Sequence, residues 1–99
     1  MSGGKGKAAK NQTLMWEVRC EPGKAAAVEE WVRAIIVPPL WEDEEVASYN
    51  AYSSVGQDGE RVVVVIDYLG AAPESLAADP PPHLIARPPH AWVFQRLDV

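Results

Sequence analysis

The sequence contains one cysteine, Cys20, among its 99 residues. A single thiol excludes an internal disulfide and every zinc or iron–sulfur site built from several cysteines. No stretch approaches the about 20 consecutive apolar residues of a transmembrane helix. The N-terminal lysines are not followed by an apolar segment, so a secretory signal is not expected. These absences favour a cytoplasmic protein with no membrane association.

Basic residues are scarce beyond the start of the chain. Three of the nine lysines and arginines, Lys5, Lys7 and Lys10, lie in a Gly/Ala-rich segment without an apolar period. The other six are outnumbered by all fourteen acidic residues, which gives the rest of the chain a net charge of −8. Because a negatively charged domain repels phosphate backbones, nucleic-acid binding is not expected. We predict that residues 1–12 are a disordered basic tail and that residues 13–99 form one domain.

The first half of this domain predicts a strand followed by a helix. Residues 13–20 alternate apolar and polar side chains, as a half-buried strand does, and the Pro-Gly pair that follows ends the strand. In residues 24–37, apolar side chains recur at spacings of three and four, which predicts an amphipathic helix with a stripe of Val28, Trp31, Val32 and Ile35. Pro38 and Pro39 are expected to end the helix, because proline disfavours helix in the residue before it.

The second half predicts three more strands. Residues 46–55 and 60–69 flank Asp58-Gly59, a pair typical of hairpin turns. Residues 70–89 are expected to be irregular, apart from one short helix at 73–78 that three prolines end. Residues 90–98 form the last predicted strand.

The strand at 60–69 contains five consecutive β-branched residues, Val62 to Ile66. An antiparallel strand with one wet face should alternate apolar and polar residues, and this one does not. Both of its faces are therefore expected to be covered, although one helix can cover only one face. A chain of this size has a thin core, so a second copy of the chain is the expected cover.

The predicted order, β-α-β-β-(α)-β, indicates an α+β domain of ferredoxin-like type with an antiparallel sheet. The junction Cys20-Glu21-Pro22-Gly23-Lys24 resembles the opening of the dimeric α+β barrel superfamily. The hairpin, and Val65-Ile66-Asp67-Tyr68 followed by Glu74 and Leu76, are similar to its antibiotic-biosynthesis-monooxygenase-like domains. The resemblance spans residues 13–99. It departs from the family where Tyr68 stands in place of a tryptophan, and where prolines shorten the second helix and delay His83.

The resemblance implies a homodimer whose sheets face each other. Members of the family include cofactor-independent oxygenases of polycyclic phenols and haem-degrading enzymes. One hypothesis is therefore a small cofactor-independent monooxygenase-like protein acting on an aromatic or polyketide-like compound. The alternative is a non-catalytic dimeric binding or assembly domain of the same fold. No cofactor is expected, and haem is the one group that the resemblance leaves open.

Six residues are candidates for an aromatic site. His83 is the candidate acid/base because histidine titrates near neutrality. The groups expected to orient a substrate are Asn50 and Tyr68, and the expected pocket walls are Trp16, Trp92 and Tyr52. Each also has a purely structural interpretation. The two histidines then belong to proline-rich connections, the tryptophans pack in the core, and polar strand residues form pairs such as Glu17–Arg61 and Asp67–Arg96.

No metal site is expected. Residues 42–45 are four consecutive carboxylates, but they lack the alternate spacing and the glycine of a calcium-binding loop. A solvated surface is the better interpretation of this run. Cys20 lies on the apolar face of its predicted strand and lacks the setting of an activated thiolate.

Overall fold

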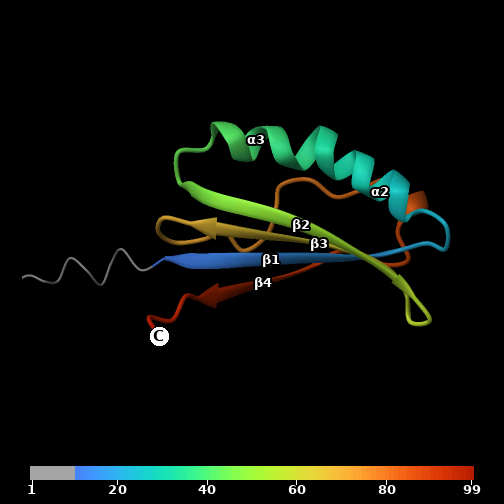
Figure 1. Ribbon diagram of the computed structural model, residues 1–99. Coiled ribbons are helices and arrows are strands. Elements are labelled where there is room, and N and C mark those ends of the chain that lie inside the picture. Colours follow the sequence, from blue (N-terminus) through green and yellow to red (C-terminus); the bar gives the residue numbers. More distant parts are fainter. Residues whose placement is uncertain (1–10) are drawn as a thin grey trace, which may run out of the picture.

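The computed structural model describes residues 11–99 as a four-stranded antiparallel sheet with one helix packed on it (Figure 1). The predicted α+β class and antiparallel sheet are confirmed. Along the sheet the strand order is β2-β3-β1-β4. The strands are β1 (Gln12–Cys20), β2 (Val46–Gly56), β3 (Gly59–Tyr68) and β4 (His90–Gln95). Residues 1–10 of the predicted tail lie outside the described part of the chain.

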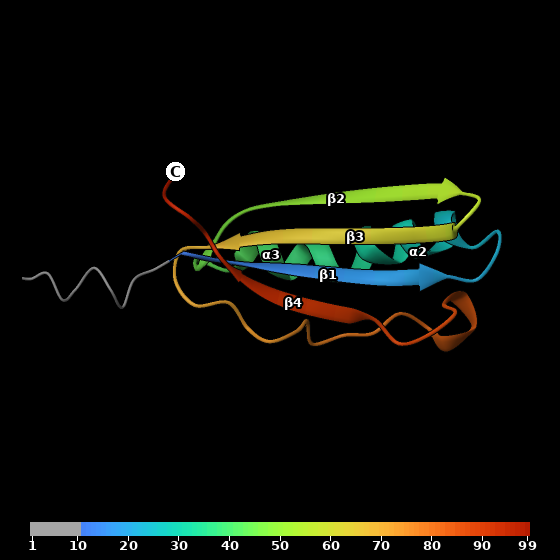
Figure 2. The same ribbon diagram turned by 90° about the horizontal axis from the view of Figure 1, so that it is seen from below.

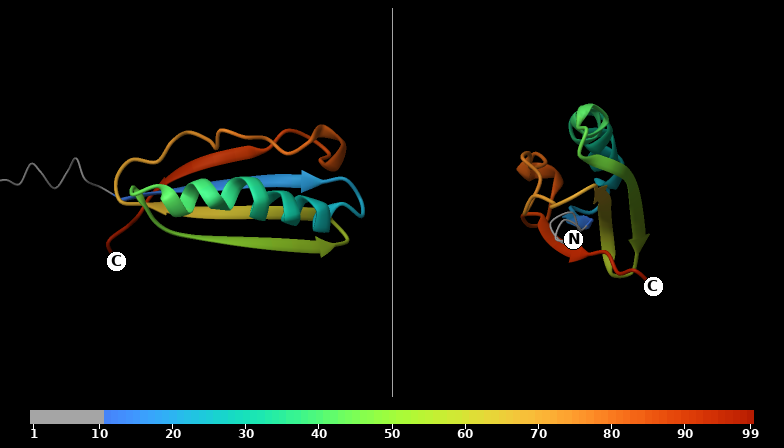
Figure 3. Two further views of the ribbon diagram at one scale, coloured as in Figure 1. Left: turned by 90° about the horizontal axis from the view of Figure 1, so that it is seen from above. Right: turned by 90° about the vertical axis from the view of Figure 1, so that its left-hand side faces the viewer.

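The core lies between the helix and the two central strands. Side chains alternate along each strand, so every second residue of β1 and β3 faces the helix. These residues are buried: Leu14, Trp16, Val18 and Cys20 on β1, and Val62, Val64, Ile66 and Tyr68 on β3. Seen from above, the helix runs over these strands (Figure 3). The alternation predicted for residues 13–20 is confirmed.

The prediction that Pro38-Pro39 ends the helix is wrong. The helix continues through three joined segments, α2 (Ala25–Trp31), the π-helical turn η1 (Val32–Ile36) and α3 (Val37–Glu42). In the π-turn the amide of Val37 donates to the carbonyl of Val32, five residues back. The two prolines come directly after this turn, at the start of α3.

The π-turn also changes which residues are buried. Val28 and Val32 face the sheet as predicted, but Ile35 is 46% exposed and Ile36 is buried in its place. The buried positions continue to Leu40 at a constant spacing of four. An α-helix repeats every 3.6 residues, so the wider π-turn is what keeps this spacing on one face.

A residue distant in the sequence caps the start of the helix. Lys24 provides no side-chain cap. Instead, the Glu60 carboxylate on β3 accepts hydrogen bonds from the amides of Gly23, at 2.7 Å, and Ala25, at 3.0 Å. Gly23 has a φ of 78°, which glycine adopts without strain. The tight connection between β1 and α2 therefore depends on the hairpin end of β3.

The short helix predicted at residues 73–78 does not form. Six residues between prolines are too few to offset the cost of helix nucleation. Residues 70–89 instead run beside β4 (Figure 2), with one 3-10 turn, η2 (Pro82–Leu84). Leu84 is buried, and Leu76 and Ile85 pack partly against the core. This irregular segment takes the position where a second helix was expected.

The second face of the sheet is open within residues 11–99. Figure 2 looks onto this face, with the helix behind the strands. The strand register places Met15 between Val65 and Trp92, and Val63 between Glu17 and Tyr52. Trp92 is 43% exposed and Phe94 46%. The chain thus covers one face of the Val62–Ile66 strand and leaves the other to solvent.

Candidate ligand site between the helix and β2

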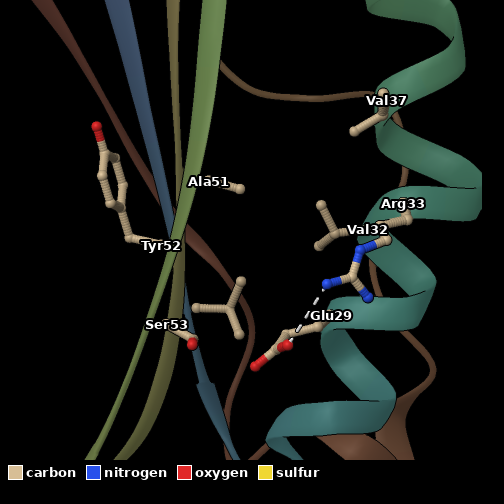
Figure 4. Close-up of a pocket in the computed structure, with 8 residues that line it drawn as sticks. Glu29, Val32, Arg33, Val37, Ala51, Tyr52 and Ser53 are labelled. Atoms are coloured by element: carbon tan, nitrogen blue, oxygen red, sulfur yellow. Dashed lines mark ion pairs between the residues drawn. The ribbon is translucent and has the colours of Figure 1, made fainter.

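A cleft of about 210 Å³ separates the helix from strand β2 (Figure 4). The helix contributes Glu29, Val32, Arg33 and Val37 to its lining, and the sheet contributes Ala51, Ser53 and Val62. Tyr52 lies at the cleft through its backbone, whereas its ring points to the other side of β2. The cleft is therefore on the helix-covered face of the sheet.

Small side chains on β2 explain why the cleft exists. The residues of β2 that face the helix side pair with Ile66, Val64 and Val62 of β3, and they are Tyr49, Ala51 and Ser53. Tyr49 packs against the core, but Ala51 and Ser53 are too short to reach the helix. Because β2 is an edge strand, no neighbouring strand fills the remaining space.

The mouth of the cleft carries opposite charges. Arg33 Nη2 lies 3.8 Å from Glu29 Oε1, and Arg33 Nη1 lies 3.6 Å from Glu30 Oε2. Both distances exceed a normal hydrogen bond, so charge attraction alone holds these pairs. The Glu29 side chain is 33% exposed and that of Arg33 67%, which places the carboxylate deeper in the cleft. A ligand here would meet both a hydrogen-bond acceptor and a donor.

The six residues predicted for an aromatic site lie in three places. Trp16 and Tyr68 are buried on the helix side, where Trp16 stacks on Trp31 with ring centroids 6.3 Å apart. Three others, Asn50, Tyr52 and Trp92, belong to the open face. His83 lies in η2, which is joined to the end of β1 by a backbone hydrogen bond from Glu21 to Leu84. Within one chain, the three predicted catalytic residues, His83, Asn50 and Tyr68, do not lie together.

Burial affects two titratable groups on the helix side. It raises the pKa of the Tyr68 phenol, and the nearby Asp43 carboxylate raises it further. Burial likewise raises the pKa of the Cys20 thiol, with Glu60 and Glu29 acting in the same direction. Both groups are therefore held in their neutral forms, and the structure gives Cys20 no activated thiolate.

Ion pairs occupy both ends of the open face. Arg61 Nε contacts Glu17 Oε2 at 2.9 Å, as one interpretation of the sequence predicted. At the other end, Asp67 accepts hydrogen bonds from Thr13 at 2.7 Å and from Ser48 at 2.9 Å, and pairs with Arg96 at 2.8 Å. The Thr13 hydrogen bond is the main cause that lowers the pKa of Asp67, and the Arg96 and Ser48 contacts add to it against the effect of burial. The open face thus has an apolar centre between two ends that carry ion pairs.

Two features are absent from residues 11–99. No group of three or more His, Cys, Asp or Glu side chains is placed to hold a metal ion in this part of the chain. In the same range, no helix is both long enough and apolar enough to cross a membrane. In comparisons with known proteins, no family model matches the chain, and no curated protein matches it either.

The cleft could not be recognised from the sequence. Glu29 and Arg33 lie outside the predicted apolar stripe, and the sequence does not predict that they form a site with Ala51 and Ser53. The one signal in the sequence is the pair of small residues, Ala51 and Ser53, which take alternate positions in a strand that also contains larger side chains. That signal is informative only once the strand is known to be an edge strand beneath the helix.

Proposed function

We propose that this chain is a homodimeric binding or assembly domain in which two copies pack their open sheet faces together. The arrangement is that of a ferredoxin-like fold in a dimeric α+β barrel. The strand order β2-β3-β1-β4 and the helix between β1 and β2 support this topology. The irregular segment 70–89 replaces the second helix of the pattern.

The apolar centre of the open face is the observation that carries the proposal. Its members lie side by side on three adjacent strands, as the register requires: Met15, Val63, Val65, Trp92 and Phe94. Contiguous exposed apolar surface with a polar rim is typical of protein interfaces. Here the two ion-paired ends provide that rim. A second copy would bring an identical apolar centre against this one.

The distribution of charge supports a second copy as the occupant. The open face carries three arginines (19, 61 and 96) and two carboxylates (Glu17 and Asp67), a net charge of +1. The remainder of residues 11–99 carries three basic and twelve acidic residues, a net charge of −9. Two copies repel each other through every acidic surface, so the open face is where they can approach most closely.

Solution mass tests this proposal directly. Light scattering should give about twice the chain mass of 10.8 kDa. Trp92→Glu places a charge in the apolar centre and should return the mass to that of one chain. Val55→Glu is the matched control, because Val55 is exposed but lies outside the open face, and its mass should stay doubled. A wild-type monomer at micromolar concentration would refute the proposal.

A second candidate is the cofactor-independent oxygenase of aromatic compounds that the family resemblance implies. The observation favouring it is the cleft between the helix and β2, which has room for an aromatic ring. It ranks second because the residues expected to catalyse the reaction do not converge. Oxygen uptake by the purified protein with a panel of single-ring phenols and anthrones tests it. If oxygen uptake does not exceed the protein-free rate, this counts against an oxygenase and leaves the dimer proposal unaffected.

A further inference from the structure

We propose that the cleft between the helix and β2 is a binding site for a neutral, single-ring aromatic compound bearing a hydroxyl or carboxamide group. This inference goes beyond the assembly function. The cleft lies on the helix side of the sheet and the proposed dimer interface lies on the open side, so either can exist without the other.

The volume of the cleft limits the ligand to one ring. A cavity of about 150 Å³ lined by apolar side chains holds benzene. The cleft measures about 210 Å³, which leaves room for a ring and one small substituent. Sites for drug-sized molecules begin near 300 Å³, so the cleft suits a single ring better than a fused polycyclic compound.

The lining of the cleft suits an aromatic ring. Val32 and Val37 provide apolar contacts from the helix, and Ala51 and Val62 provide them from the sheet. In Figure 4 the side chains of Val32 and Ala51 point towards each other across the cleft. A flat ring between them would be in contact on both of its faces.

The charges at the mouth select for a neutral polar group. Glu29 accepts hydrogen bonds and Arg33 donates them, and the two side chains lie 3.8 Å apart. A carboxylate on the ligand would be repelled by Glu29 and by Glu30, and an amine would have to displace Arg33 from the Glu29 carboxylate. A hydroxyl or a primary amide satisfies both, because it donates to the carboxylate and accepts from the guanidinium.

The π-turn is a second, independent feature of the same site. Val32 and Arg33 are its first two residues, and both line the cleft. Single π-turns within α-helices are frequent at functional sites. Here the wider turn sets Arg33 at the cleft and keeps Val32 on the buried face. The two prolines that follow restrict the backbone and help to hold this conformation.

Titration of the ¹⁵N-labelled protein with five small probes tests the assignment. Phenol and benzamide should shift the amide resonances of Val32, Arg33, Ala51 and Ser53, with a Kd on the order of 1 mM, as suits so few atoms. Benzoate, which has the same charge as Glu29 and Glu30, and toluene, which lacks a polar group, should bind at least about tenfold more weakly. Benzylamine should also bind more weakly than phenol, because it must displace Arg33 from Glu29. Equal binding of all five, or shifts confined to the open face, would overturn the proposal.

Variants at the mouth and in the cleft sharpen the test. Glu29→Gln should gain affinity for benzoate, and Arg33→Gln should gain affinity for benzylamine, reciprocal changes that a purely structural role cannot produce. Ala51→Leu should abolish binding by filling the space, whereas Asn50→Leu, on the opposite face of the same strand, should leave it intact. Trp92→Glu should still bind phenol, which separates this site from the dimer. Binding unchanged in Ala51→Leu would also overturn the assignment.

Discussion

The two faces of strand β3 carry the same kind of side chain and have opposite surroundings. Val62 and Val64 are at most 2% exposed beneath the helix, while Val63 and Val65 are only half-buried on the open face. Side-chain type does not distinguish them, because all four are valine. The difference shows that position relative to the helix decides whether a residue is buried in the core of the chain or stays on an open surface.

The largest effect is expected at Val64. Val64→Asp places an unpaired charge in the core, where Val64 is fully buried, and should cost about 4 kcal/mol or more of unfolding free energy. Circular dichroism should show an unfolded chain at room temperature. A folded Val64→Asp domain with an unchanged urea midpoint would contradict the assignment of this face to the core.

The neighbouring substitution should separate assembly from folding. Val65→Asp puts the same charge on the open face, where water reaches the carboxylate in a single chain but not in a packed dimer. We expect the dimer Kd to rise by about 100-fold or more, roughly 3 kcal/mol, while the monomer keeps its circular dichroism spectrum. Sedimentation equilibrium over a range of concentrations measures this. If Val65→Asp stays dimeric, the open face is not the interface.

A smaller effect is expected at the cap of the helix. Glu60→Ala removes both hydrogen bonds to the amides of Gly23 and Ala25, and should lower the unfolding free energy by about 1–2 kcal/mol. Urea denaturation measures the change. Glu44→Ala, in the exposed acidic loop, is the control and should alter stability by less than about 0.5 kcal/mol. Equal losses in the two variants would mean that Glu60 does not cap the helix.

The smallest effect is a pH dependence at one end of the open face. The hydrogen bond from Thr13, with those from Arg96 and Ser48, lowers the pKa of Asp67 in the folded state. Its contribution to stability is therefore complete above the unfolded pKa of about 3.9 and is lost as the pH falls through the lower folded value. Urea midpoints measured between pH 6 and pH 2 should decline less in Asp67→Asn than in the wild type. Parallel curves would show that Asp67 has no such role.

Most of the strands could be predicted from sequence, while the helix boundaries and the site could not. Alternation in residues 13–20 and the Asp58-Gly59 turn are local signals, and both are confirmed. The helix was predicted to stop at Pro38 because proline breaks an α-helix, and the π-turn that admits the prolines has no clear local signature. The cleft depends on Ala51 facing Val32 across a gap between a strand and the helix, an arrangement that only the packed structure defines.

The sequence by itself determined that this chain has a hairpin, an amphipathic helix and a central strand apolar on both sides. These features follow from backbone sterics and from side-chain period, which act over a few residues. Only the tertiary structure decided which face of that strand the helix covers, that Glu60 caps the helix, and that small residues on an edge strand leave a cleft. The physical reason is that burial depends on contacts between residues far apart in the chain. The same valines can therefore form a core on one face and an open surface on the other.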